Sequence, residues 1–174
     1  MTTTFIMPKN MVKWFWWFVL KKIIKISIIS FIVVLLDQII KIIINNNIGL
    51  GDGFDIIKNF LYITNVHNEG AAWSILNGNV LLLIFISIIA LVAILCYIKN
   101  TKTNNFSEVL YAILIGGIIG NLLDRILYKY VIDYIGIIIF GYNFPIFNLA
   151  DICIVLSIII LFLKSCLEDI CKKK

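Results

Sequence analysis

Four long apolar stretches constrain what this chain can fold into more than any other feature. They cover residues 23–44, 80–98, 109–127 and 147–163. A helix needs about 20 mostly apolar residues to cross the roughly 30 Å hydrocarbon layer of a bilayer, and the four stretches approach or exceed that length. We therefore predict an all-α membrane protein with four transmembrane helices.

The composition excludes several other classes of protein. Of 174 residues, 61% are apolar and 14% are charged, whereas soluble domains are about 45–50% apolar and about 25% charged. A disordered chain, a collagen, a cytosolic enzyme and a disulfide-stapled miniprotein do not fit. The length predicts one membrane domain over residues 1–174. No CxxC spacing is present, so we predict free thiols at the four cysteines, Cys96, Cys153, Cys166 and Cys171.

The basic residues predict how the chain crosses the membrane. Five lysines lie near the N-terminus, two near residue 100 and four at the C-terminus, whereas the other two connections hold only Lys58 and Lys129. The positive-inside rule then places both termini in the cytoplasm and loops 45–79 and 128–146 outside. Topology thus explains the net charge of +5 without nucleic acid, for which no groove-reading motif is present.

The segment before the first apolar stretch is aromatic and basic. Residues 14–18 read Trp-Phe-Trp-Trp-Phe between lysines, a composition suited to a membrane interface. We predict either a short interfacial helix or an extension of the first helix. A cleaved signal peptide is disfavoured because no small-x-small site follows the apolar run.

The two outer loops contain strand-like sequences. Residues 60–67 and 131–140 are rich in β-branched and aromatic side chains. A small extracytoplasmic β-sheet is expected, either covering the outer helix ends or lying on the lipid headgroups.

Most carboxylates fall on the predicted outer side. Ionisable groups at membrane depth cost several kcal/mol unless they are paired or hydrated. Their concentration therefore indicates a functional site at the outer face. The seven are Asp37, Asp52, Asp55, Glu69, Asp124, Asp133 and Asp151.

Two helices carry polar residues at spacings that put them on one face. Asp37 and Lys41 are four residues apart, so they can pair. In the third stretch Asn121 and Asp124 share a face and Arg125 follows directly, which predicts a buried ion pair of Asp124 with Arg125. A carboxylate beside a guanidinium stays ionised, so Asp124 is a poor general acid. The glycines at 116, 117 and 120 predict close helix packing.

Two further aspartates form the preferred catalytic pair. Asp133 interrupts an apolar strand-like sequence, and Asp151 lies three residues after Asn148, the expected helix cap. Two carboxylates that share a proton divide the roles of general base and general acid, which is the chemistry of aspartyl hydrolysis. Asp124 with Asp151 remains a second candidate pair.

Other catalytic schemes have less support. A serine or cysteine triad needs a base, and the sole histidine, His67, is expected in a loop. No metal-binding histidine cluster is present. The GxGD sequence at residues 49–52 lies in a polar loop and is interpreted as a chance match.

Five blocks of sequence resemble bacterial lipoprotein signal peptidase (signal peptidase II). In order they are residues 37–41 (DQIIK), 68–74 (NEGAAWS), 116–125 (GGIIGNLLDR), 131–135 (VIDYI) and 147–151 (FNLAD). The resemblance implies an aspartyl endopeptidase of the bacterial cytoplasmic membrane that cleaves diacylglyceryl-modified prolipoproteins before the lipobox cysteine by direct water attack. It implies no cofactor or metal, contact with membrane lipids, and a monomer.

The resemblance also implies roles for individual residues. Asp133 and Asp151 would be catalytic. Supporting or substrate-binding positions would be Asp37, Lys41, Asn68, Asn121, Asp124, Arg125 and Asn148. A different class remains open: a small transporter or channel subunit that uses the carboxylates as an ion relay. A third reading, a structural membrane adaptor, leaves the outer carboxylates unexplained.

Overall fold

The computed structural model describes residues 9–71 and 75–172, and over these ranges four long helices dominate. They are α1 (Lys9–Asn47), α2 (Val80–Asn100), α3 (Asn105–Tyr128) and α4 (Leu149–Lys172). Each contains a segment long and apolar enough to cross a membrane. Large apolar side chains face outward, and Phe31, Leu81 and Phe162 are 66%, 76% and 66% exposed. Such surfaces require lipid as their solvent, which confirms the predicted fold class.

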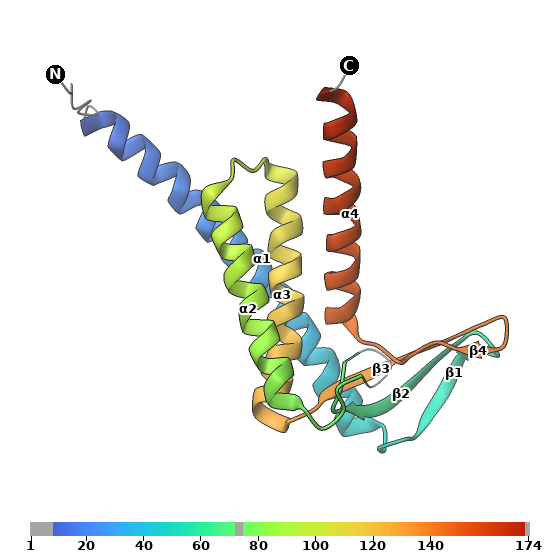
Figure 1. Cartoon of the computed structure of the whole chain (residues 1–174). Helices are drawn as coiled ribbons and strands as arrows, with labels where there is room; N and C mark the ends of the chain where they lie inside the picture. The colour runs from blue at the N-terminus through green and yellow to red at the C-terminus, as the bar shows by residue number, and fades with distance from the viewer. Residues whose placement is uncertain (1–8, 72–74, 173–174) are drawn as a thin grey trace.

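A small antiparallel sheet lies at one end of the helices, opposite both termini (Figure 1). Its strands, in spatial order, are β1 (Gly53–Ile57), β2 (Leu61–Asn68), β3 (Val131–Ile139) and β4 (Tyr142–Asn143). Both predicted strands are confirmed as β2 and β3. The sequence reasoning missed β1, which begins at Gly53, directly after the sequence 49–52 that was assigned to a polar loop. Gly53 pairs with Thr64 at the start of the strand.

Helix α3 packs against the other three helices, and its glycines allow this. A Cβ at position 116 would lie 2.7 Å from the Val33 Cβ of α1, and one at position 117 would lie 2.6 Å from the Ala150 carbonyl oxygen of α4. Neither distance is sterically possible without a shift of the neighbouring helix. The predicted role of the glycines in close packing is therefore confirmed.

The helix ends differ from the predicted boundaries for local reasons. α1 begins at Lys9 and runs without a break through the aromatic segment, so this segment is an extension of the first helix. α4 begins at Leu149 instead of residue 147, because Asn148 occupies the cap position. The four cysteines are free thiols in the described part of the chain, as predicted.

Candidate active site

Asp133 lies in the middle of the site, on strand β3. Its side chain is only 2% exposed, so its oxygens need protein donors. The amide of Asn68, on the neighbouring strand β2, donates to Oδ2 at 2.8 Å, and the amide of Asn148 donates to Oδ1 at 2.6 Å. Pairing of Val66 with Asp133 in the ladder sets the register that brings Asn68 within reach. The carboxylate is thus held from both sides.

Asp151 lies in the first turn of α4 and takes part in a reciprocal cap. Its backbone N–H donates to Oδ1 of Asn148 at 2.9 Å, and the backbone N–H of Asn148 donates to Oδ2 of Asp151 at 3.2 Å. This arrangement satisfies two free donors at the helix start, as a capping box does. The predicted cap is confirmed, and it fixes where the Asp151 carboxylate points.

Two asparagine amides connect the candidate catalytic carboxylates. The Nδ2 atom of Asn148 donates both to Asp133 and, at 3.1 Å, to Oδ1 of Asn121. The Nδ2 atom of Asn121 in turn donates to Oδ1 of Asp151 at 2.7 Å. Asp133 and Asp151, 18 positions apart in the sequence, are thereby held in one hydrogen-bonded cluster.

A buried lysine supports this cluster from behind. Nζ of Lys41, 1% exposed, lies 2.8 Å from a carboxylate oxygen of Asp37 and 2.8 Å from one of Asp124, and it donates to Oδ1 of Asn121 at 2.9 Å. The Asp37 to Lys41 pairing is confirmed. The expected ion pair of Asp124 with Arg125 is wrong, because adjacent residues on a helix point in different directions and Asp124 faces α1.

Arg125 instead holds the connection that follows β2. One guanidinium nitrogen donates to the Gly70 carbonyl at 3.0 Å, and its Nε is buried without a hydrogen-bond partner among the described residues. The first part of the NEGAAWS block, residues 68–70, therefore lies against the site. Residues 72–74 of the block are outside the described residues.

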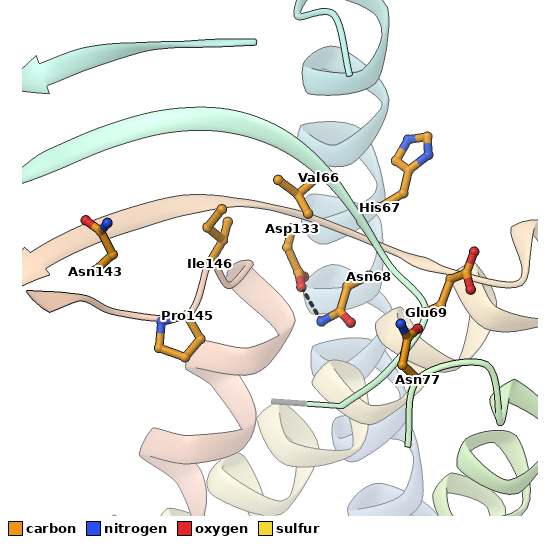
Figure 2. A pocket seen from close by; sticks show the side chains of 9 residues that line it. All are labelled: Val66, His67, Asn68, Glu69, Asn77, Asp133, Asn143, Pro145 and Ile146. Atoms are coloured by element: carbon orange, nitrogen blue, oxygen red, sulfur yellow. Dashed lines mark hydrogen bonds between the residues drawn. The ribbon is translucent and has the colours of Figure 1, made fainter. Parts of the chain in front are cut away.

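A cavity of about 620 Å³ opens over Asp133. Figure 2 shows Asn68 and Asp133 pointing toward one another, whereas His67 projects away from them. His67 lies on β2 rather than in a loop, and its ring stacks on Tyr130 with centroids 3.8 Å apart. No group of three or more potential metal-ligating side chains occurs within the part of the chain that the structure describes.

The surroundings of Asp133 favour its neutral form. Burial, and then the nearby charge of Asp151, raise the pKa of Asp133 from 3.8 to about 7. The amide donors of Asn68 and Asn148 and the charge of Lys41 act in the opposite direction. A carboxyl group with a pKa near neutrality can hold or release a proton under physiological conditions, as an acid-base group must.

Comparison with known proteins decides the family. The family model described as signal peptidase (SPase) II matches residues 29–167. The chain belongs to the signal peptidase II family. Lipoprotein signal peptidases of Staphylococcus aureus strains JH9 and Newman are each 41% identical to it over 148 residues, which is 84% of this chain and 90% of the relative.

Solved structures agree with this family assignment. A bacterial membrane enzyme solved by the in meso method at 2.3 Å resolution is 40% identical, with a TM-score of 0.77 over 86% of this chain and 92% of that one. A second one, at 1.9 Å, is 39% identical, with a TM-score of 0.73 over 81% and 92%. As a signal peptidase II family member the chain is a peptidase, which disfavours the transporter and adaptor alternatives.

Two residues beside the site were missed from the sequence of this peptidase. Gln38 donates to Oδ1 of Asp124 at 2.8 Å, and the hydroxyl of Tyr134 accepts the Leu149 N–H at 3.1 Å. Each directly follows a residue that was selected, Asp37 or Asp133. A polar side chain directly beside an aspartate in an otherwise apolar segment is the sequence signal that could have identified Gln38 and Tyr134.

Proposed function

We propose that this peptidase removes signal peptides from diacylglyceryl-modified prolipoproteins, cleaving on the N-terminal side of the lipidated lipobox cysteine. Family membership and the names of the relatives support the substrate class. One observation carries the mechanism: two carboxylates from separate elements, Asp133 and Asp151, are joined through Asn121 and Asn148 beside a cavity. Such a pair is suited to the direct attack of water on a peptide carbonyl.

The two carboxylates divide the proton transfers. Asp133, whose pKa is about 7, holds a proton near neutral pH and donates a hydrogen bond to the scissile carbonyl. Asp151 accepts the proton of the attacking water. The hydrogen bond from the backbone N–H of Asn148 to Oδ2, part of the α4 cap, keeps this carboxylate oriented. The tetrahedral intermediate then collapses as the leaving amine takes up a proton from the pair. No acyl-enzyme forms, and no metal or cofactor takes part.

The competing pair of Asp124 with Asp151 has less support. Asp124 is fully buried, pairs with Lys41 at 2.8 Å and accepts a hydrogen bond from Gln38. Lys41 therefore compensates the charge of Asp124 directly, whereas among the described residues Asp133 and Asp151 are held by amide donors and not by a cation in contact. We assign Asp124 a supporting role, together with Asp37 and Lys41.

We further propose that the chain is one domain, acts as a monomer in contact with lipid, and lies in the bacterial cytoplasmic membrane. Both termini would face the cytoplasm and the site would lie at the outer face, as the distribution of lysines indicates. The sheet and the site lie at the end of the helices opposite the termini, which is consistent with this orientation (Figure 1).

A gel-shift assay tests the proposal. Purified protein in detergent is incubated with a diacylglyceryl-modified prolipoprotein and with its unlipidated form. Wild type should cleave only the lipidated substrate, and Asp133→Asn and Asp151→Asn should each lose at least about 10³-fold in rate, as expected for loss of an essential acid-base group. The matched control is Asp55→Asn, at an exposed carboxylate on β1, which should cleave like wild type.

Two outcomes would overturn parts of the proposal. If Asp133→Asn cleaves like wild type and a correctly folded Asp124→Asn does not cleave, the acid-base residue is Asp124 and not Asp133. If lipidated and unlipidated substrates are cleaved equally, the enzyme does not recognise the diacylglyceryl group.

A further inference from the structure

The N-terminal part of α1 extends well beyond the other helices. α1 has 39 residues, whereas α2 has 21 and α3 has 24. At 1.5 Å per residue α1 is about 58 Å long, nearly twice the hydrocarbon thickness of a bilayer. Figure 1 shows its N-terminal end projecting obliquely past the turn that connects α2 and α3. This end also precedes the part of the chain that matches the family, which begins at residue 29.

Side-chain contacts mark where the extension begins. Nζ of Lys22 donates to the carbonyl of Ile98 near the end of α2 at 2.7 Å. Nζ of Lys25 lies 2.5 Å from a carboxylate oxygen of Glu108, in the first turn of α3. These contacts place Lys22 and Lys25 level with the ends of α2 and α3. Residues 9–21 therefore extend beyond that level, for about 20 Å along the helix axis.

The sequence of the extension does not suit water. Five of its residues, 14–18, are aromatic, and Val19 and Leu20 follow. Of the described side chains in this segment, Trp17 is 46% and Leu20 is 56% exposed. Aromatic and basic residues at the end of a transmembrane helix are typical of the membrane–water interface.

The charge of the extension points to one kind of lipid. Lys9, Lys13 and Lys21 lie within it, Lys22 and Lys25 follow, and no acidic residue precedes Asp37. Nζ of Lys21 lies 3.5 Å from the centroid of the Trp17 ring, so a cation is held directly beside an interfacial aromatic side chain. Basic clusters next to a transmembrane helix attract anionic headgroups.

We infer that residues 9–21 of α1 form a docking surface for anionic phospholipid headgroups of the leaflet next to the termini. The lysines supply the charge, and the aromatic residues keep the helix at headgroup depth. This surface lies at the other end of the molecule from the candidate catalytic residues. The inference does not depend on the proposed cleavage reaction.

Spin-labelled lipids test this in the full-length protein. Wild type is reconstituted in phosphatidylcholine vesicles that contain a trace of spin-labelled phosphatidylglycerol or phosphatidylcholine. The ratio of the two association constants then measures selectivity for the anionic headgroup. The test variant is Lys9→Gln with Lys13→Gln and Lys21→Gln, which leaves Lys22 and Lys25 in their contacts. The matched control changes Lys172, Lys173 and Lys174 to Gln, removing the same charge at the other end of the chain.

We expect wild type to prefer phosphatidylglycerol and the test variant to lose at least about twofold of that preference, since it removes three positive charges that attract anionic headgroups. The C-terminal control should keep the wild-type ratio, and arginine at positions 9, 13 and 21 should preserve selectivity. An unchanged ratio in the test variant, or an equal loss in the C-terminal control, would overturn the inference. Cleavage activity in detergent should be unchanged in every variant, which separates this result from the proposed function.

Discussion

Replacing Asp133 by asparagine should make the folded protein more resistant to rising pH while it removes catalysis. The reason is the cost of ionising a carboxyl group that is 2% exposed and lies near another carboxylate, Asp151. Asparagine has nearly the same shape but cannot ionise. The difference in stability between the two proteins should therefore depend on pH in a defined way.

The magnitude follows from the shifted pKa of Asp133, which rises from 3.8 to about 7 on folding. Between these values the folded state binds more protons than the unfolded state, so the stability of wild type falls as pH rises. A shift of about 3 units corresponds to about 4 kcal/mol, reached above about pH 7 and absent below about pH 4. Asparagine also leaves one amide donor, of Asn68 or Asn148, without its acceptor, which costs about 1–3 kcal/mol at every pH.

Thermal unfolding followed by tryptophan fluorescence in one detergent, at intervals between pH 4 and pH 8, measures this difference. The measured quantity is the Tm of Asp133→Asn minus the Tm of wild type. This difference should be roughly 8–16 °C larger near neutral pH than at pH 4, if 1 kcal/mol shifts Tm by about 2–4 °C. Asp55→Asn, at an exposed position, should follow wild type throughout. A difference between wild type and Asp133→Asn that does not change with pH would refute the reasoning.

Two further predictions concern residues around the pair. Lys41→Met should destabilise the protein by about 3–5 kcal/mol, because it leaves two buried carboxylates without their cation. Adding Asp37→Asn and Asp124→Asn to this variant should restore most of the lost stability, as measured by chemical denaturation. A triple variant that is no more stable than Lys41→Met would contradict the pairing. Asn68→Ala removes a hydrogen bond that lowers the pKa of Asp133. The alkaline limb of the kcat/KM profile should therefore move to higher pH, and a shift to lower pH would contradict the role of Asp133 as the acid.

Local sequence patterns predicted the elements well because each has a local cause. Apolar runs of bilayer length became α1 to α4, and β-branched runs became β2 and β3. Asn148 and Asp151, three residues apart, formed the predicted cap, since both groups belong to one helix start. The glycines of α3 became the close contacts with Val33 and Ala150.

Partners across elements could not be predicted in this way. Arg125 follows Asp124 in the chain, yet Lys41, 83 positions away, is the cation that pairs with it. Direct neighbours on a helix are about 100° apart, so adjacency in sequence opposes contact between their side chains. Lys41 pairs with Asp124 because of how α1 and α3 are rotated relative to each other. This rotation is set by the packing of the two helices and cannot be read from either helix alone.

By itself the sequence determined that the chain spans a membrane with four helices and that its carboxylates gather near one side, because hydropathy and charge act residue by residue. Only the tertiary structure decided which polar groups meet. Asp133 on β3, Asp151 on α4 and Asn121 on α3 come together because strand register, the α4 cap and the glycine contacts of α3 act at once. That convergence gives Asp133 its raised pKa, which burial creates and no isolated segment could supply.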